Sequence, residues 1–315
     1  MRNQTNPTGN EARRSQRPSE ETKNSETMKA KKDVYEIVTE KLITALEAGT
    51  APWHKSWGTI ETMPANFQSG KKYRGINTFL LNCAGFNSPY YLTYKQAKEK
   101  GGNVKKGEKG MPVVFWNWIY KDASGKTIKD PKQATKKIPF LRYYTVFNAE
   151  QIEGIEFPAV DIPTREHTPS EACEKIVDGM PNPPQMETQG NQPCYIPSQD
   201  KVRMPKPEHF EGGEEYYSTL FHELTHSTGH KSRLNRKELT KVSGFGSRDY
   251  SKEELVAEMG AAFLCSQAGI ENTIDNSAAY LQSWIKKLKG DPKLAVMAAA
   301  QAQKAADYIL DKKAA

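Results

Sequence analysis

The sequence predicts a mixed α+β protein with two folded domains, the first built from helices and a β-hairpin, the second mostly helical with a small sheet. Several stretches repeat apolar residues at helical spacing, and two strand-like runs flank a lysine-rich segment. The net charge also changes sign along the chain. The first 150 residues hold 26 Lys and Arg against 14 Asp and Glu, whereas the rest hold 19 against 24. A basic half beside an acidic half indicates two units with different partners.

Composition sets the predicted domain boundaries. Residues 1–30 are polar and charged with almost nothing to bury, which predicts a disordered tail. Residues 31–150 form the first predicted domain, residues 151–167 a proline-containing linker, and residues 168–315 the second domain.

Composition also narrows the class of protein. At 315 residues and 37% hydrophobic, the chain is long enough to bury two cores. No apolar run approaches the roughly 20 residues needed to cross a bilayer, and no apolar segment follows the N-terminal charges, so neither a membrane span nor a secretory signal is expected. The four cysteines lie far apart without a C-x-x-C pair, which indicates reduced thiols in a cytoplasmic protein.

Three helices are expected in the first domain. Apolar residues recur at helical spacing from Val34, and Gly49 is placed to end this helix. A short apolar helix is predicted over residues 77–84. Thr93 can cap a third helix over residues 94–100.

Two strand-like runs, residues 113–120 and 140–147, flank a polar, lysine-rich segment and predict a long β-hairpin. Side chains alternate between the two faces of a strand. Phe115 should therefore lie on the opposite face from Trp116 and Trp118.

The basic charge of the first domain is concentrated and interleaved with aromatic residues. Residues 71–109 carry nine Lys and Arg against two acids. Cations neutralise phosphates, and aromatic rings stack on bases that have left a duplex, so the combination favours single-stranded nucleic acid. The alternative is a solvated basic surface over an aromatic core. The candidate DNA-binding residues are Lys71, Lys72, Tyr73, Arg74, Asn77, Lys105, Lys106, Trp116 and Trp118.

The second domain opens with residues 168–171, Thr-Pro-Ser-Glu, which fit a capping box with proline at the first helical position and start a helix to about Val177. Four prolines and two glycines make residues 179–193 loop-forming. Residues 194–196 and 202–204 are short strand-like runs around a turn, which predict a small sheet.

An H-E-x-x-H motif follows, within an apolar-periodic run that predicts a helix ending at Gly229. Residues four apart share one face of a helix, so His222 and His226 can offer two imidazole nitrogens to one metal ion. Glu223 can take a proton from water on that ion. The alternative is a helix that carries two histidines by chance, which the total of six histidines in the chain disfavours.

The remainder of the second domain is predicted to be helical. Residues 250–264 form a strongly helical segment, and residues 277–289 and 292–310 give two closing helices. The first of these segments carries two acids four apart, Glu254 and Glu258, on one face.

The residue pattern leaves the third metal ligand open. One carboxylate of the acidic face can bind the metal while a second accepts from a ligand histidine's ring N–H. Glu254 is the favoured ligand, Glu258 is the orienting carboxylate or alternative ligand, and Glu253 is expected to face away. Ser251 and Glu254 also fit a capping box, in which the Glu254 carboxylate would bind the Ser251 backbone N–H instead of a metal. His230, just past the motif, is a weaker candidate.

Two histidines and a glutamate around Zn²⁺, or a related divalent ion such as Mn²⁺, leave one position for water. Glu223 then serves as general base and afterwards as proton donor to the leaving amine, while the ion polarises the scissile carbonyl. This is the chemistry of peptide hydrolysis. A small sheet just before the motif agrees, because zinc peptidases pair extended substrates along an edge strand. Tyr195 and Tyr250 are candidate donors to the oxyanion.

Both halves of the chain contain segments that resemble one known family. In the second half these are residues 221–230, 232–236 and 252–258, and in the first half they are Pro52-Trp53, Tyr73-Arg74-Gly75-Ile76-Asn77, Thr93-Tyr94 and Lys105-Lys106-Gly107. In this order they resemble the ArdC antirestriction proteins of conjugative plasmids, whose peptidase-like domain also occurs in polyvalent proteins of phages and plasmids. The resemblance covers about residues 32–312.

The resemblance implies a single-stranded-DNA-binding domain fused to a zincin-like metallopeptidase domain, in a protein that protects incoming plasmid DNA from host restriction during conjugation. It implies that His222, His226 and Glu254 are the metal ligands and that Glu223 is the catalytic glutamate. The implied partners are single-stranded DNA and an unidentified protein substrate, such as a host restriction component.

Two other functions fit the same residues. One is a DNA-dependent protease that acts on DNA-bound proteins. The other is a non-catalytic single-strand-binding protein whose metal site is structural. They differ in whether Glu223 performs chemistry and whether DNA stimulates it.

Overall fold

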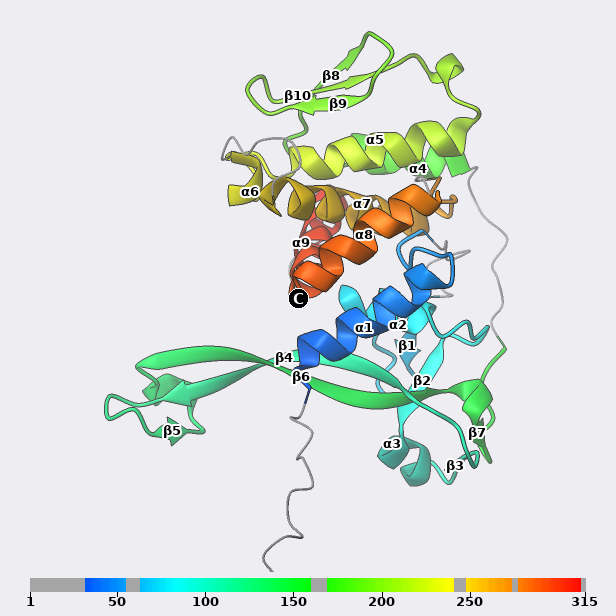
Figure 1. Cartoon of the computed structure of the whole chain (residues 1–315), viewed down its shortest axis with the longest axis vertical. Coiled ribbons are helices and arrows are strands. Elements are labelled where there is room, and N and C mark those ends of the chain that lie inside the picture. Colours follow the sequence, from blue (N-terminus) through cyan, green and yellow to red (C-terminus); the bar gives the residue numbers. More distant parts are fainter. Residues whose placement is uncertain (1–31, 55–62, 160–168, 241–247, 274–276, 313–315) are drawn as a thin grey trace, which may run out of the picture. The chain divides into compact units, whose positions relative to one another are not determined.

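The computed structural model describes residues 32–54, 63–159, 169–240, 248–273 and 277–312 (Figure 1). Over these residues, helices alternate with strands that pair into small sheets, so the predicted α+β class is confirmed.

Some sequence predictions lie outside the described residues. They are the tail (residues 1–30), the end of the linker (residues 160–167) and the cap of the next helix at Thr168. Within the described ranges, every helix is too short or too polar to cross a bilayer.

The first two helices form as predicted. α1 (Val34–Glu47) begins with a capping box between Asp33 and Glu36, which satisfies backbone N–H groups that the first turn leaves open. It ends before Gly49, whose φ of 90° is a left-handed conformation that favours glycine. α2 (Ile76–Asn82) is the predicted short apolar helix.

The first half is organised around a five-stranded sheet of order β1-β2-β6-β4-β5. Its long members, β4 (Met111–Lys121) and β6 (Lys136–Asn148), pair antiparallel, which confirms the predicted hairpin (Figure 1). The short members are β1 (Ala65–Asn66), β2 (Tyr90–Thr93) and β5 (Thr127–Ile128), and β5 follows the turn at the far end of the hairpin.

Short elements complete this half. α3 (Tyr94–Glu99) starts at the predicted cap, where the Thr93 hydroxyl accepts from the Gln96 N–H at 3.2 Å. The remaining elements are η3 (Pro131–Gln133), η4 (Ala149–Gln151), and the antiparallel pair β3 (Asn103–Val104) and β7 (Ile152–Glu153).

The second half begins with α4 (Pro169–Asp178) and a three-stranded sheet of order β8-β10-β9. β9 (Cys194–Ile196) and β10 (Lys201–Met204) confirm the predicted strands. The prediction of a loop over residues 179–193 is wrong in part, because β8 (Gln185–Thr188) pairs parallel to β10. Its side chains are mostly exposed, so it lacks the apolar pattern that reveals a strand. Backbone pairing and the ion pairs of Glu187 with Lys201 and Arg203 hold it to β10.

Helices form the rest of the second half: η5 (Pro207–His209), α5 (Gly213–Ser227), α6 (Lys237–Thr240), α7 (Arg248–Ala268), α8 (Ala278–Gly290) and α9 (Leu294–Ile309). The predicted H-E-x-x-H helix (α5), the helix that carries Glu254 and Glu258 (α7) and both closing helices (α8 and α9) are confirmed. Because α7 begins at Arg248, Ser251 lies inside it, and the alternative of a capping box between Ser251 and Glu254 is wrong.

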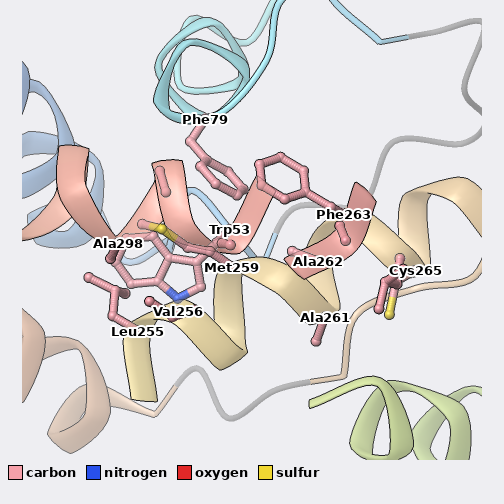
Figure 2. Packing of buried hydrophobic residues seen from close by; sticks show 14 of the residues in the cluster. Trp53, Phe79, Leu255, Val256, Met259, Ala261, Ala262, Phe263, Cys265 and Ala298 are labelled. Atoms are coloured by element: carbon pink, nitrogen blue, oxygen red, sulfur yellow. The ribbon is translucent and has the colours of Figure 1, made fainter. Parts of the chain in front are cut away.

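Residues from both halves share the largest hydrophobic cluster. Phe79 of α2 stacks on Phe263 of α7 with ring centroids 4.9 Å apart (Figure 2). Trp53 packs edge-on against Trp284 of α8 with centroids 6.1 Å apart. These rings are almost fully buried. One side of α7 is therefore packed against residues of the basic first half.

On its other side α7 packs against α5 at very short range. A Cβ atom built on Gly260 would lie 2.5 Å from Thr225 Cγ2 and 2.8 Å from its Oγ1. Only glycine allows this separation, so Gly260 and Thr225 fix how closely the two helices approach.

We expect Gly260→Ala to lower the free energy of unfolding by about 1–3 kcal/mol, because the added methyl group overpacks the α5–α7 contact. The matched control is Gly290→Ala at the end of α8, where no atom lies within 4 Å of an added Cβ. Urea unfolding of both variants measures the difference. A second substitution, Thr225→Ala, should restore part of the loss, and a Gly260→Ala protein as stable as the wild type would contradict the constraint.

Candidate metal centre and nucleic-acid interface

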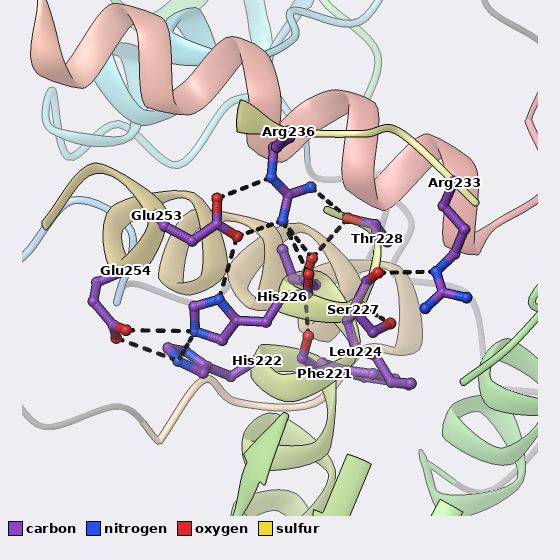
Figure 3. A network of polar contacts seen from close by, with 11 residues as sticks. Phe221, His222, Leu224, His226, Ser227, Thr228, Arg233, Arg236, Glu253 and Glu254 are labelled. Carbon is purple, nitrogen blue, oxygen red and sulfur yellow. Dashed lines mark hydrogen bonds and ion pairs between the residues drawn. The ribbon is translucent and has the colours of Figure 1, made fainter. Parts of the chain in front are cut away.

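The H-E-x-x-H histidines lie one turn apart on α5 and point the same way (Figure 3). Leu220, Phe221 and Leu224 bury the rest of the helix in the core, which holds it in place. The Nε2 atoms of His222 and His226 lie 3.1 Å apart. Two imidazole nitrogens are thus directed at one point in space.

Glu254 of α7 completes the group. Its Oε2 lies 3.7 Å from His222 Nε2, and its Oε1 lies 3.6 Å from His226 Nε2. These are the separations a metal site requires, because a tetrahedral ion with bonds of about 2.0–2.1 Å holds its ligand atoms about 3.3 Å apart. The donor set of two imidazoles and one carboxylate also suits a divalent ion such as zinc. The residues fit a metal.

The charge state of Glu254 fits a ligand as well. Burial alone would raise its pKa, but the hydrogen bond with His222 and the charges of His226 and His222 outweigh burial and lower the pKa to about 2. The carboxylate is therefore ionised throughout the neutral range, as a metal ligand must be.

Glu253 does not face away, and that prediction is wrong. Its Oε1 lies 3.3 Å from His226 Nδ1, on the opposite side of the ring from Glu254 (Figure 3). Successive helix residues are separated by 100°, so Glu253 and Glu254 flank the line along which α7 meets α5. A carboxylate on Nδ1 fixes the tautomer that leaves the Nε2 lone pair for a metal. Burial would lower the pKa of His226, but the hydrogen bond and charge of Glu253 raise it.

Arg236 holds Glu253 in this position. The Arg236 guanidinium donates to both carboxylate oxygens, at 3.0 Å through Nε and 2.5 Å through Nη2, and Nη2 also donates to the Thr225 carbonyl at 2.8 Å. Gly229 makes room, because a Cβ there would lie 3.0 Å from Nη2. Gly229 lies at the predicted position just past the helix end, because α5 ends at Ser227 and Thr228 is its C-cap. It has no left-handed φ, so the glycine there serves to make room for Arg236.

Glu258 lies outside the group of ligand atoms. It accepts hydrogen bonds from Trp53 Nε1 at 2.9 Å and from the Tyr280 hydroxyl. Burial raises the pKa of Glu258 to about 7, although both hydrogen bonds oppose the rise. The structure places this carboxylate between α7 and the loop after α1, where it joins the two halves of the chain.

The other candidates near the metal group are placed as follows. Glu223 is buried on α5 beside the histidines. His230 lies 2.8 Å from Ser232 Oγ, measured from Nδ1, and is not in the ligand group. Tyr195 donates its hydroxyl to Asp200 at 2.8 Å. Tyr250 lies beside Glu254, and burial together with the Glu254 charge and hydrogen bond raises its pKa to about 12.

A second site lies on the five-stranded sheet. A pocket of about 540 Å³ opens there, and six of the candidate DNA-binding residues line it: Lys71, Lys72, Tyr73, Arg74, Asn77 and Trp116. Lys105, Lys106 and Trp118 do not line it. Lys105 and Lys106 are exposed on the turn before β4, and Trp118 is exposed on β4 with Lys137 Nζ 4.0 Å from its ring centre.

Two of the pocket residues serve mainly the fold. Tyr73 is only 6% exposed and packs edge-on against Tyr91, so it is a core ring rather than an open stacking surface. Both amide atoms of Asn77 are bonded to the Val114 backbone at 2.7 Å, which fastens α2 to β4 and leaves little for a nucleic acid. Tyr73 was a candidate because lysines and an arginine surround it in the sequence, but such neighbours occur beside buried and exposed rings alike.

Sequence reasoning missed four residues of these sites. Glu253 and Arg236 carry no spacing signal that separates them from other helical charges, because their pairing depends on how α7 is rotated against α5. Phe115 and Tyr144 line the pocket and are 44% and 45% exposed. For Phe115 the available signal was the alternation along β4, which placed its side chain on the face opposite Trp116 and Trp118.

We expect Glu253→Gln to lower the free energy of unfolding by about 3 kcal/mol or more, because it leaves the buried Arg236 charge unpaired. Glu187→Gln, which breaks a pair with Arg203 at the surface, is the matched control and should leave the urea midpoint nearly unchanged. Equal midpoints for the two variants would show that the buried pair does not hold the helices together.

Comparisons with known proteins assign both halves. Residues 32–147 match the family model of the N-terminal domain of the anti-restriction factor ArdC, and residues 172–302 match that of a zincin-like metallopeptidase. Crystal structures of the antirestriction protein ArdC from plasmid R388 are similar. The metal-free form is 40% identical with a TM-score of 0.69, covering 89% of this chain and 97% of that one, and the Mn(II)-bound form is 38% identical with a TM-score of 0.68, covering 89% and 98%.

Two curated relatives match most of this chain but differ in how much of their own length the match covers. A DNA primase TraC of Escherichia coli is 39% identical over 300 residues, which cover 90% of this chain but only 20% of the primase, so the chain spans about a fifth of that relative. The uncharacterized protein y4eC of Sinorhizobium fredii is 34% identical over 88% of this chain and 91% of its own length. With both halves matched in order and an R388 protein matched over nearly its whole length, the chain belongs to the ArdC antirestriction family.

Proposed function

We propose that the protein binds single-stranded plasmid DNA as it enters a cell during conjugation, protects it from host restriction, and carries a working metallopeptidase site. The observation that carries the proposal is the group formed by His222, His226 and Glu254, with Glu223 next to it on the same helix. The Mn(II)-bound structure of the R388 relative supports a divalent ion in this family.

The metal would be held by His222 and His226 through Nε2 and by Glu254 through a carboxylate oxygen. Arg236 holds Glu253, and Glu253 binds His226 Nδ1, so the ring is oriented with Nε2 toward the metal position. When bound, Zn²⁺ or Mn²⁺ supplies the Lewis acidity that polarises a peptide carbonyl and acidifies a water molecule.

Glu223 is the residue that moves protons in this proposal. It lies between the two histidines in sequence, and its charge acts on His226 strongly enough to contribute to that residue's raised pKa. Its carboxylate takes a proton from the attacking water and delivers it to the amine that leaves. Burial keeps bulk water away from this transfer and strengthens its electrostatics.

The accessibility of the site favours catalysis over a purely structural metal. The side chains of His222 and Glu254 are 20% and 25% exposed, so a substrate can approach the side opposite Arg236. Three protein ligands leave one tetrahedral position open, whereas structural zinc sites are closed by four. We therefore rank the non-catalytic alternative second.

The DNA-binding part of the proposal rests on charge and aromatic side chains. Lys71, Lys72 and Arg74 line a pocket on the sheet, Lys105 and Lys106 add exposed charge, and exposed rings lie along the hairpin. Cations neutralise phosphates of any strand, but rings stack only on unpaired bases. Such a surface favours single strands. A protein bound to that DNA would be presented to the metal group at a high local concentration. In this proposal the protein acts on DNA in the cytoplasm.

For the metal group, we expect His222→Ala to abolish stoichiometric binding of Zn²⁺ or Mn²⁺, measured by calorimetry and by metal analysis of the purified protein. Glu223→Ala should still bind the ion, because it removes no ligand, but should lose proteolysis and the protection of transferred DNA. His209→Ala, an exposed histidine outside the group, is the control and should change neither property.

The outcomes separate the alternatives. Protection by Glu223→Ala equal to that of the wild type would leave only the DNA-coating role. Cleavage of DNA-bound proteins that rises when single-stranded DNA is added would instead support a DNA-dependent protease. Retention of the ion by His222→Ala would contradict the assigned ligands.

For DNA binding, we expect affinity for single strands to fall as salt rises, with a log–log slope of about −0.7 for each phosphate neutralised. Lys105→Ala combined with Lys106→Ala should make the slope shallower by about 1.4. Lys286→Ala with Lys304→Ala removes the same charge from exposed positions of the second half and should leave the slope unchanged. Equal affinity for duplex and single strand, measured by fluorescence anisotropy, would contradict the stacking contribution.

A further inference from the structure

The pocket on the five-stranded sheet has the form of a small-molecule site rather than a flat track for a backbone. Its volume of about 540 Å³ falls within the range of roughly 300–1,000 Å³ typical of such sites. Tyr73, Val113 and Val146 line it and belong to the second hydrophobic cluster, so part of its wall is a continuation of the core. An apolar wall of this kind favours a planar apolar group over a bare phosphate.

Two exposed aromatic rings adjoin this wall. Tyr144 pairs with Val113 across the hairpin, so Tyr144, Val113 and Phe115 share one face of the sheet. The rings of Phe115 and Tyr144 meet edge to face, with centroids 5.7 Å apart. Each is nearly half exposed, so a flat partner can contact both rings.

Cations lie beside the aromatic wall. Lys71, Lys72 and Arg74 come from the segment that precedes α2 and line the same pocket. Arg74 is held in place by its ion pair with Asp307 of α9, yet 48% of its side chain stays exposed. An anion at the rim and an aromatic group inside would satisfy both parts of the lining.

A nucleotide is the ligand with this combination of a flat base and an attached phosphate. We propose that the pocket takes one unstacked nucleotide of a bound single strand, with the base against Phe115 and Tyr144 and a phosphate beside Lys71, Lys72 and Arg74. The inference rests on the proposed binding of single-stranded DNA and assigns it a specific subsite. Tyr143, on the opposite face of the hairpin, does not line the pocket.

The adjacent tyrosines give a matched test, since they are similarly exposed but lie on opposite faces. We expect Tyr144→Ala, and likewise Phe115→Ala, to weaken binding of a thymidine 12-mer roughly five- to hundredfold, the range for loss of one base–aromatic stack. Tyr143→Ala should change it by less than about twofold. An abasic 12-mer with the same phosphates should bind all variants equally, which also shows that they are folded.

Photocrosslinking locates the base directly. A 12-mer of 5-iododeoxyuridine bound to the full-length wild-type protein and irradiated should label Phe115 or Tyr144, as mapped by residue-level mass spectrometry. Labels confined to Tyr143 or Trp118, or a Tyr144→Ala protein that binds the thymidine strand as tightly as the wild type, would overturn the subsite while leaving single-strand binding intact. If the wild type binds neither strand, the proposed function itself fails.

Discussion

The contact between α5 and α7 is the constraint on which the metal group depends. The two histidines belong to one helix and the glutamate to the other, so the separations of their ligand atoms follow from how the helices pack. The Gly260 backbone lies directly against the Thr225 side chain, and this contact sets the distance of that packing. Metal and catalytic sites tolerate errors of only about 0.5 Å, and a contact between a glycine and a β-branched residue gives that precision.

Arg236 and Glu253 reinforce the same contact electrostatically. Removing two charges from water is costly, and a lone buried pair often fails to recover that cost. Here the guanidinium also meets the carbonyls of Thr225 and His226 near the C-terminal end of α5, where the helix dipole favours a positive charge. One side chain thus satisfies the helix end, ties α7 to α5 and orients a metal ligand.

Local signals predicted the elements of the fold well. The H-E-x-x-H helix, the helix cap at Thr93 and the long hairpin depend on residues near one another in sequence, so their patterns are visible there. β8 was missed because its side chains are mostly exposed and polar, so it has no apolar pattern that would reveal a strand. The contacts within the metal site were harder to predict from the sequence. Glu253 and Glu254 are neighbours with equal helical propensity, and only the rotation of α7 against α5 decides which one meets which nitrogen of His226.

The shared core of the two halves bears on how such proteins can exchange parts. Family models recognise two modules in this chain, yet Phe79 stacks on Phe263, and Trp53 packs on Trp284 while its indole N–H binds Glu258. A recombinant that joins the first module of one relative to the second of another must therefore match ring shapes and a buried acid across the seam. Modules that look interchangeable along the sequence are, in their interior, a fitted pair.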